Sequence, residues 1–331
     1  MRENQDPVRA GLPEAVRLDL DFDTARLTAD LETLSRHTWR LQTTYSSDGA
    51  LSPAAVDWRV LPLRSVGGDP DRTDSGGPGL HEHEPTPWLE RTPYLARVLA
   101  SIPAQLRSAR LMALAPGALG ADHEDTKHAV AWGTARLHIP ITTNPAALLY
   151  IDGYTHHWTP GSVWLGNFSR RHHVENRGDQ TRVHLVIDAM PGKALFELIP
   201  DDVRAAADPA CILFCREPVP LPADLAASRP YQFPLPASFA DWEEHEGNFL
   251  RPQPTLSARV TLGGGRAAPG LTLDGEPAFR LVHLGGGEFR LAGWTDERTV
   301  QLVDGEHGPQ VILRTRAANR QLQLTVAAHR V

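Results

Sequence analysis

Three side chains in this sequence have the types and the spacing of a mononuclear non-haem iron site. His123 and Asp125 form an H-x-D motif in Ala121-Asp-His-Glu-Asp125, and His172 follows much later in Arg170-Arg-His-His-Val-Glu-Asn176. Two neutral imidazoles and one carboxylate can occupy one face of an octahedral Fe(II) ion and leave the opposite face open for a cosubstrate and dioxygen. This ligand set predicts oxidative chemistry at a bound iron.

The spacing within H-x-D supports this interpretation. Along a β-strand, side chains two positions apart point to the same face, so His123 and Asp125 can bind one metal while Glu124 points away. By itself the motif is weak, because a chain with 15 histidines contains it by chance. His173 is the main rival of His172 for the third ligand, since a register change of one residue along the strand would exchange them.

Two further segments combine an apolar face with a face of cations and imidazoles. If both are strands, Arg136 and His138 share one face of the first, and Arg182 and His184 share one face of the second. Buried guanidinium groups need an anion to offset their desolvation. The anion 2-oxoglutarate fits, because its keto acid chelates Fe(II) and its distal carboxylate needs a bidentate arginine. A hairpin over 176–179 would turn Arg182 back towards the metal.

The elements that must position these residues are mostly short strands separated by Pro/Gly turns. We expect strands at 110–114, 135–141, 147–152, 162–167 and 182–188. Such a series suggests a jelly-roll or cupin-like barrel. Ahead of it, the sequence predicts a strand around 18–22 and two amphipathic helices, one at 24–36 and one that begins near Thr92-Pro93. The Gly- and Pro-rich stretch 67–79 is interpreted as a mobile loop or lid.

The length and the turn-rich composition predict one main domain with an appendage. The chain has 331 residues, of which 28 are proline and 27 glycine. We expect an Fe(II)/2-oxoglutarate dioxygenase domain over 1–195 and a Pro-rich connector over 196–255. An accessory antiparallel β-meander is expected over 256–331, where short strand patterns alternate with Gly-rich turns.

Charge and composition argue against several classes of partner. The net charge is −7 and the basic residues are scattered, which does not fit binding to nucleic acid or to an anionic membrane. The sequence contains neither a signal peptide nor a stretch near the about 20 apolar residues of a membrane span. We therefore expect a cytoplasmic protein with an amino-acid or peptide substrate. Cys211 and Cys215 are interpreted as buried thiols.

Five segments then stand in a distinctive order. They are Arg110-Leu-Met-Ala-Leu-Ala-Pro-Gly117, His123-x-Asp125, Arg136-Leu-His-Ile-Pro-Ile141, His172-His-Val-Glu-Asn-Arg-Gly178 and Arg182-Val-His-Leu-Val-Ile-Asp188. Together they resemble the aspartyl/asparaginyl β-hydroxylase family of Fe(II)/2-oxoglutarate-dependent oxygenases, and bacterial proline cis-4-hydroxylases look similar in the same places. The resemblance covers about residues 18–192.

The resemblance implies a double-stranded β-helix that uses Fe(II), 2-oxoglutarate and O2 to hydroxylate an unactivated C–H bond, with release of succinate and CO2. It assigns iron ligation to His123, Asp125 and His172. It also makes Arg182 the clamp for the distal carboxylate of 2-oxoglutarate, with Arg136 and His138 completing that pocket. The carboxylate ligand is missing in the vertebrate branch, so this chain looks closer to the bacterial amino-acid hydroxylases, although its C-terminal meander departs from the helical tail of the proline enzymes.

Substrate contacts are expected from Arg110, Trp132 and His184. A surface salt bridge is the alternative role for Arg110, and a hydrogen-bonded core position is the alternative for His184. The edge strands of the C-terminal meander could take up an extended peptide, so the expected substrate leans to a peptidyl or tethered Asp/Asn-type residue in natural-product maturation. A free amino acid of the proline type is the alternative substrate, and desaturation is an alternative outcome of the same chemistry.

A non-catalytic cupin-like protein that binds a metal or a small acid is the alternative from another class. Among the other histidines, His128, His156 and His157 are expected to be exposed or to lie in a substrate loop. The run His81-Glu-His-Glu84 is interpreted as a surface loop rather than a second metal site.

Overall fold

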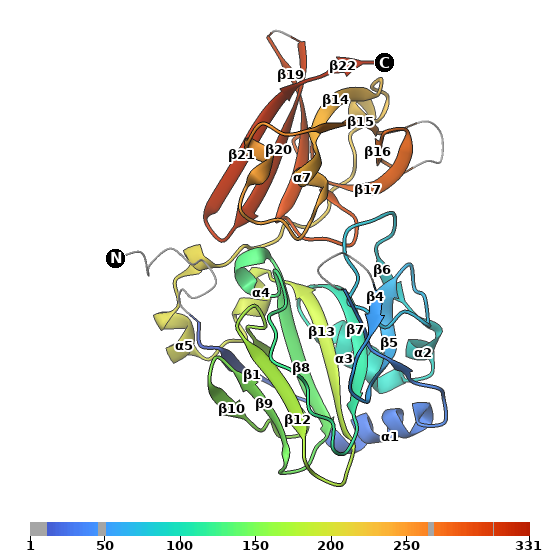
Figure 1. The fold of residues 1–331 in the computed structure, drawn as a ribbon, viewed down its shortest axis with the longest axis vertical. Coiled ribbons are helices and arrows are strands. Elements are labelled where there is room, and N and C mark those ends of the chain that lie inside the picture. Colours follow the sequence, from blue (N-terminus) through green and yellow to red (C-terminus); the bar gives the residue numbers. More distant parts are fainter. Residues whose placement is uncertain (1–11, 46–50, 264–267, 307) are drawn as a thin grey trace. The chain divides into compact units, whose positions relative to one another are not determined.

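The computed structural model describes residues 12–45, 51–263, 268–306 and 308–331. The chain forms two compact units (Figure 1). The first unit comprises Met1–Gly76 and His83–Cys211, and the second comprises Gly77–Glu82 and Ile212–Val331. None of the helices in the described ranges has the length and apolarity that crossing a bilayer requires.

The first unit contains two main antiparallel sheets. The large sheet has the strand order β1-β11-β8-β13-β7-β5-β2, with β6 paired to β5, and the small sheet has the order β10-β9-β12. The large-sheet strands are β1 Ala15–Asp21, β2 Arg40–Leu41, β5 Trp58–Val66, β6 His83–Pro85, β7 Gln105–Leu114, β8 Ala135–Thr142, β11 Ser162–Gly166 and β13 Arg182–Met190. The small-sheet strands are β9 Ala147–Ile151, β10 Tyr154–His156 and β12 His172–Asn176, and β3 Thr43–Tyr45 pairs separately with β4 Leu51–Pro53.

The two sheets face each other across a shared apolar layer. Leu114 of β7 packs in one buried cluster with Leu149 and Ile151 of β9 and Val174 of β12. Two antiparallel sheets joined by such a layer make up the jelly-roll architecture that the strand pattern predicts. The expected mainly β, double-stranded β-helix core is therefore confirmed.

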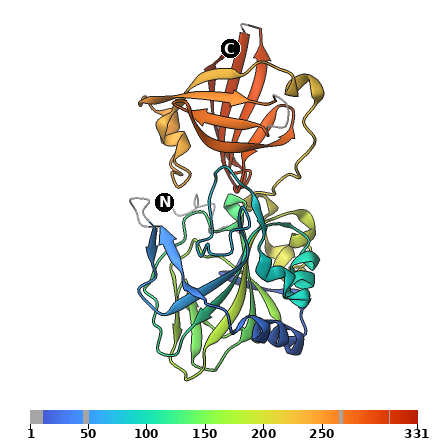
Figure 2. The same ribbon diagram turned by 90° about the vertical axis from the view of Figure 1, so that its right-hand side faces the viewer.

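Helices cover the opposite face of the large sheet (Figure 2). In strands β8 and β13 the odd-numbered side chains, such as Leu137 and Leu185, join a core with Leu27 of helix α1 and Leu95 of helix α3. The even-numbered, polar side chains must then point to the small sheet, because strand side chains alternate between faces. This alternation places the arginines and histidines between the two sheets.

The helices of the first unit are α1 Thr24–Leu34, α2 Pro87–Glu90, α3 Pro93–Ser101, η1 Val130–Trp132, α4 Lys193–Phe196, α5 Asp201–Ala206 and η2 Pro209–Cys211. Both predicted N-terminal helices are present. The side chain of Asp30 in α1 accepts hydrogen bonds from the backbone N–H groups of Tyr94 and Leu95, each at 2.8 Å. A buried carboxylate thus satisfies the first N–H groups of a neighbouring helix, which ties the two helices together.

The expected hairpin before Arg182 is wrong. Among the named strands β12 pairs with β9 of the small sheet, whereas β13 pairs with β7 and β8, so the chain over 177–181 crosses from the small sheet to the large one. The crossover still brings the two predicted residues to one space. His172 at the start of β12 and Arg182 at the start of β13 lie in opposite sheets, and both face the space between them.

The second unit contains one nine-stranded antiparallel sheet, in the order β21-β20-β19-β18-β17-β16-β15-β14-β22. Its strands are β14 Tyr231–Pro236, β15 Thr255–Thr261, β16 Gly270–Leu273, β17 Glu276–Gly285, β18 Glu288–Leu291, β19 Arg298–Gly305, β20 Gly308–Ala317, β21 Arg320–Ala327 and β22 His329–Arg330, and its helices are α6 Ala223–Ala226, α7 Ala237–Ala240 and η3 Asn248–Leu250. The expected small C-terminal β-domain is confirmed, but it begins earlier than predicted. Strand β14 lies inside the segment 196–255 that the sequence analysis assigns to a connector.

The ends of this sheet meet. Strand β22 directly follows β21 in the chain, yet it pairs with β14 through Tyr231↔Arg330 and Gln232↔His329. The terminal strand therefore brings the sheet into a nearly closed, barrel-like form around a core that includes Phe233, Phe289 and Trp294. The edge of β14 is covered by β22, whereas β21 pairs with β20 on one side and ends the strand order.

A short segment from the N-terminal half of the chain also belongs to the second unit. We call Gly77–Glu82 the strap. The backbone of Gly79 pairs with β17 and with the turn after β18, donating to Ala292 O at 3.0 Å and accepting from Arg280 N at 2.9 Å. The carboxylate of Glu82 accepts from Arg290 Nη1 at 2.6 Å and from the backbone N–H of Gly293 at 3.0 Å.

Part of the predicted lid 67–79 is held in place. Gly77–Gly79 belong to the strap, and Thr73 and Asp74 are buried. The Asp74 carboxylate accepts from the backbone N–H of Gly76 at 2.7 Å, which holds the turn ahead of the strap. The Gly-rich composition of this stretch reflects close packing of backbone against backbone.

Gly293 gives a test of the strap. It has φ +74°, and a Cβ there would lie 2.6 Å from Gly77 O, whereas a Cβ at Gly275, with φ +92°, would meet nothing within 4 Å. Replacing either glycine by alanine should cost about 1 kcal/mol of unfolding free energy from the left-handed backbone. Gly293→Ala should cost about 1–3 kcal/mol more from the clash with the strap. Equal urea unfolding midpoints for the two variants would show that the strap yields without cost.

Candidate metal centre

The structure brings His123, Asp125 and His172 together. One potential ligand atom from each lies within 4.8 Å of the others. Within the part of the chain that the structure describes, this is the group of side chains that could hold a metal ion. His123 Nε2 lies 3.6 Å from Asp125 Oδ1, and the two imidazole ring centres are 4.2 Å apart. Two imidazoles and a carboxylate at this spacing fit the donor set of a non-haem Fe(II) ion.

Backbone pairing holds the ligand segments in place. His123 and His172 form an isolated antiparallel bridge, with N–H to O distances of 3.0 and 2.9 Å in the two directions. The backbone N–H of Asp125 donates to Phe168 O at 2.9 Å. The H-x-D segment is therefore a loop anchored at two points rather than the regular strand that the sequence analysis expects. Its side chains still converge because both anchors lie on the same neighbouring segment.

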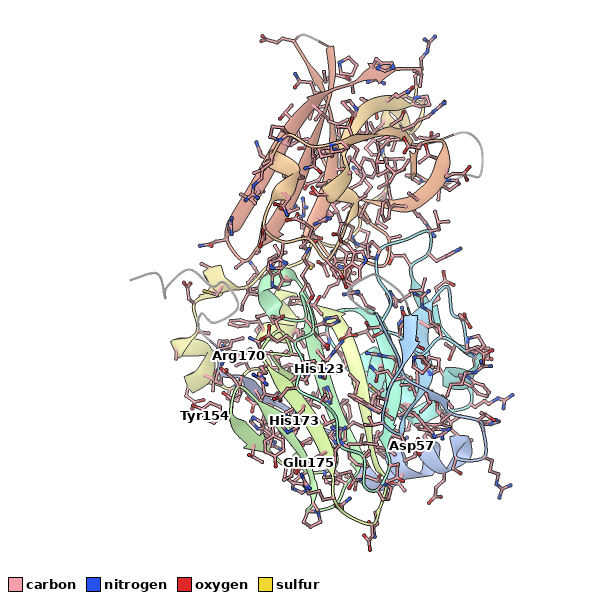
Figure 3. All side chains as sticks on the ribbon, in the orientation of Figure 1. Asp57, His123, Tyr154, Arg170, His173 and Glu175 are labelled. Carbon is pink, nitrogen blue, oxygen red and sulfur yellow. The ribbon has the colours of Figure 1, made fainter. Side chains whose placement is uncertain are left out.

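The neighbouring histidine is excluded from this group by its direction. His173 Nδ1 lies 2.6 Å from Asp122 Oδ1, and its ring stacks on Tyr150 with centres 4.5 Å apart. Figure 3 labels His123 and, along β12, His173 and Glu175, which share the outer side of that strand. The alternation of a strand thus selects His172 over its rival.

The electrostatics suit a metal ligand set. Burial lowers the pKa of His172 to about 4, so its imidazole is neutral at pH 7, as a ligand must be. Burial would raise the pKa of Asp125, but Arg136 beside it outweighs burial and keeps the carboxyl ionised. Arg136 Nη1 donates to Asp125 Oδ2 and fixes its orientation.

Arg136 is also bound by a second carboxylate. Its Nε donates to Asp188 Oδ1 at 2.7 Å, and Asp188 stands directly opposite it in the pairing of β13 with β8. The guanidinium of Arg136 is therefore paired with two carboxylates, those of Asp125 and Asp188. The structure places Arg136 as a positioning partner of Asp125 and not, as expected, in the pocket for an additional anion.

Asp188 is the centre of this network. Its Oδ2 accepts from Ser108 Oγ at 2.7 Å and lies 3.4 Å from Arg110 Nη2, and the side chain is fully buried. Sequence analysis passed over Asp188, although it lies four and six positions from His184 and Arg182, the polar residues on the same face of its strand. That period-two pattern is the signal that could have identified it.

Neutralising Asp188 should therefore destabilise the first unit. Asp188→Asn keeps the side-chain shape but leaves Arg110 without its counter-ion, with an expected loss of about 3–5 kcal/mol of unfolding free energy. Asp21→Asn is the control, because the Arg17–Asp21 pair is exposed and should contribute less than about 1 kcal/mol. Urea unfolding of the full chain measures both. If both variants lost less than about 1 kcal/mol of unfolding free energy, water would have to reach Asp188.

A second cluster surrounds Arg182. The guanidinium is 4% exposed, and its Nη2 donates to His184 Nδ1 at 2.7 Å. Among the described residues no carboxylate pairs with it, and burial alone lowers the pKa of Arg182 to about 9. His138 lies next to His184, with 3.3 Å between their Nδ1 atoms. The structure thus brings together the predicted Arg182, His138 and His184.

Two buried polar atoms beside Arg182 lack hydrogen-bond partners in the described structure, namely His138 Nε2 and Trp158 Nε1. Trp158 stacks near His184, with ring centres 6.3 Å apart. An indole N–H can only donate, so it requires an acceptor. The sequence carries no pattern that would have singled out Trp158.

Phe168 joins the two clusters. Its ring lies 4.9 Å from those of both His138 and His172. The rings of His172, Phe168, His138 and His184 therefore follow one another from the candidate metal ligands to the guanidinium of Arg182. This arrangement fits an anion that is chelated at one end and salt-bridged at the other.

The remaining predicted residues are more dispersed. Trp132 is half-buried, with Lys127 Nζ 5.5 Å from its ring centre. His157 is exposed, as expected. His128 is buried, so of its two expected placements, exposed or in a substrate loop, the exposed one is wrong. Half-buried His156 lies 3.4 Å from Glu14.

The run at 81–84 is only partly the surface loop that was expected, because His81 and Glu84 are exposed but the two residues between them are not. His83 is buried in β6, and Glu82 belongs to the strap. Cys211 and Cys215 form no disulfide and are half-buried, less buried than expected.

Comparison with known proteins agrees with this geometry. The family model for aspartyl/asparaginyl beta-hydroxylase matches residues 22–191, about half of the chain. A search of curated proteins finds no match.

Solved structures show distant similarity. An oxidoreductase of the 2OG-Fe(II) oxygenase family from Burkholderia pseudomallei has a TM-score of 0.35 and 13% identity, with coverage of 51% of this chain and 79% of that chain. The non-haem alpha-ketoglutarate-dependent carbocyclase SnoK from nogalamycin biosynthesis has a TM-score of 0.37 and 13% identity, covering 58% and 85%. A prolyl-4-hydroxylase from Pseudomonas putida has a TM-score of 0.28 and 14% identity, covering 50% and 98%.

The family-model match thus spans the H-x-D segment, the distant histidine and the unpaired arginine, in the order that the motifs predict. It confirms the resemblance drawn from the sequence. The chain is an enzyme that belongs to the aspartyl/asparaginyl β-hydroxylase family of Fe(II)/2-oxoglutarate-dependent oxygenases.

Proposed function

We propose that the first unit hydroxylates an amino-acid side chain, with iron held by His123, Asp125 and His172 and 2-oxoglutarate held by Arg182. The buried guanidinium of Arg182, which has no carboxylate partner in the described structure, carries this proposal. A buried cation without a counter-ion is costly unless a ligand supplies the anion. The distal carboxylate of 2-oxoglutarate is the anion that this family of oxygenases requires.

The residues around Arg182 fit that carboxylate. The guanidinium can donate two parallel hydrogen bonds, and the unpartnered Nε1–H of Trp158 offers a third. Phe168 and Trp158 form apolar walls between the clamp and the metal ligands. When bound, Fe(II) activates dioxygen, so that one oxygen atom enters the substrate C–H bond and the other enters succinate as 2-oxoglutarate loses CO2.

The protein's own residues orient this chemistry. Arg136 holds the Asp125 carboxylate in one direction, and the bridged backbones of His123 and His172 keep their rings at a fixed separation. The buried setting of His172 favours its neutral, ligating form. Preorganised ligands of this kind cost little rearrangement on metal binding.

The substrate is proposed to carry a carboxylate or amide oxygen. Arg110 is fully buried, its contact with Asp188 is long at 3.4 Å, and its Nε has no acceptor in the described structure. It can therefore donate to a substrate oxygen beside the metal site. A peptidyl or tethered Asp/Asn-type residue and a free amino acid of the proline type are both candidate substrates, and the assay compares them.

One assay tests the proposal. The enzyme is incubated with Fe(II), ascorbate, 2-oxoglutarate and O2, and CO2 release from 2-oxoglutarate is measured with the common amino acids and with short Asp- or Asn-containing peptides. A stimulating compound should gain the mass of one oxygen atom. Loss of two hydrogens instead would indicate desaturation, and absence of any 2-oxoglutarate turnover would overturn the proposed function.

A further inference from the structure

We propose that His128 is a specificity-determining residue whose Nε2 accepts a hydrogen bond from an N–H group of the substrate. This inference rests on the proposed function and extends it to how the substrate is recognised. The N–H group is the ammonium of a free amino acid or the amide of a peptide residue. Both share the donor that His128 requires.

The protonation state of His128 follows from its hydrogen bonding. Its Nδ1 lies 3.0 Å from Thr126 O, and a carbonyl oxygen can only accept. In the neutral imidazole Nδ1 therefore carries the proton and donates, which leaves a lone pair on Nε2. The residue is 7% exposed, and Nε2 is a buried atom without a hydrogen-bond partner in the described structure. An unpaired buried acceptor is unfavourable, so a ligand that supplies the donor binds more tightly.

The position of His128 connects it to the metal centre. Its backbone N–H donates to Asp125 O at 3.1 Å, so the residue is tied to the ligand segment. The charged side chains with the largest electrostatic effect on its ring are Arg136, Asp188 and Asp125. The same three side chains also interact electrostatically with Arg110. His128 and Arg110 therefore border the same charged cluster.

The two unpartnered atoms are chemically complementary. Arg110 Nε is a donor in need of an acceptor, and His128 Nε2 is an acceptor in need of a donor. The backbone of an α-amino acid presents both groups, an N–H and a carboxylate or carbonyl oxygen, on atoms one carbon apart. A simple dicarboxylate has the oxygen but lacks the donor, so this pair would distinguish a substrate from the cosubstrate.

Three matched sets of probes test the inference with the iron-loaded full chain. They are free L-amino acids, their N-acetyl methylamides and the corresponding deamino acids, which lack the N–H donor. The readout is the KM for each probe in stimulated CO2 release from 2-oxoglutarate, together with the KM for 2-oxoglutarate itself. The free acids and the methylamides separate an ammonium donor from an amide donor.

The key variant is His128→Phe, which keeps a ring and removes the acceptor. For probes with the N–H donor its KM should rise about 10–100-fold, while the KM of deamino probes changes little, so the variant loses the discrimination between them. His128→Gln should restore part of the discrimination, because its side-chain oxygen accepts. The KM for 2-oxoglutarate should move less than about twofold.

A matched control exists in the second unit. His283 is likewise buried, with Nδ1 3.1 Å from Pro220 O and Nε2 unpartnered in the described structure. His283→Phe should leave every KM unchanged, and thermal unfolding checks that both variants fold. Equal KM effects on N–H and deamino probes would overturn the role of His128 while the proposed function stands. Failure of every probe to stimulate turnover would overturn the inference together with the amino-acid substrate class.

Discussion

Replacing His123 by alanine is expected to remove metal binding and to lower 2-oxoglutarate turnover by more than about 100-fold. The estimate is a lower limit, because loss of an outer-shell partner alone typically costs 10–100-fold in a metal site. The fold should survive. The His123 side chain is 43% exposed, and its bridge to His172 uses backbone atoms that alanine retains.

His173→Ala is the matched control for this prediction. Its imidazole contacts Asp122 and Tyr150 on the outer side of β12 and does not reach the ligand group. Bound iron per chain, measured by atomic absorption, should fall to background in His123→Ala and stay near one in His173→Ala. Loss of iron in both variants would shift the third ligand by one residue and contradict the assignment of His172, whereas retained iron in His123→Ala would contradict the assignment of His123.

Replacing Arg182 by methionine is expected to raise the KM for 2-oxoglutarate about 100-fold. A bidentate pair of charge-assisted hydrogen bonds is lost, whereas the volume of the side chain is largely kept. Stability should respond in the opposite direction. Because the buried guanidinium has no carboxylate partner in the described structure, Arg182→Met should leave the unfolding free energy of the ligand-free protein unchanged or higher.

Arg298→Met provides the contrast. Arg298 is also fully buried, but its guanidinium donates to Phe239 O at 2.7 Å, to Asp241 O and to Glu244 O at 2.9 Å. Its replacement should destabilise the second unit and leave the KM for 2-oxoglutarate unchanged. An unaltered 2-oxoglutarate KM in Arg182→Met would place the clamp elsewhere.

The pairing of Arg182 with His184 and of Arg136 with His138 on one face was predictable, because it depends on local strand alternation whatever sheet each strand joins. The convergence of His123 and Asp125 was also predicted, but for the wrong reason, since they lie in a loop that is anchored to His172 and Phe168 and not in a strand.

What the alternation could not reveal is the cross-strand partner. The register of β13 with β8 puts Asp188 opposite Arg136, so that this guanidinium already binds two carboxylates.

The layers of the first unit were predictable in the same way, whereas the connections between them were not. Leu27 and Leu95 lie on helical stripes that identify the core face of each helix. The turn residues of the segment 177–181 suit a hairpin and a crossover between sheets equally well. Which of these forms depends on packing between β12 and β9, which is distant in sequence from the turn itself.

The strap has a consequence for how the molecule is made. Its Glu82 finds its partners 208 and 211 residues further along the chain, at Arg290 and Gly293. During synthesis the ribosome therefore releases the strap long before the strands that receive it exist. Contacts of such long sequence separation form late and slowly. The turn ahead of the strap is held within the first unit, where Thr73 Oγ1 accepts from the backbone N–H of Thr43 at 3.1 Å. The strap itself must wait until the C-terminal strands have emerged, so completion of translation sets when the whole chain reaches its final form.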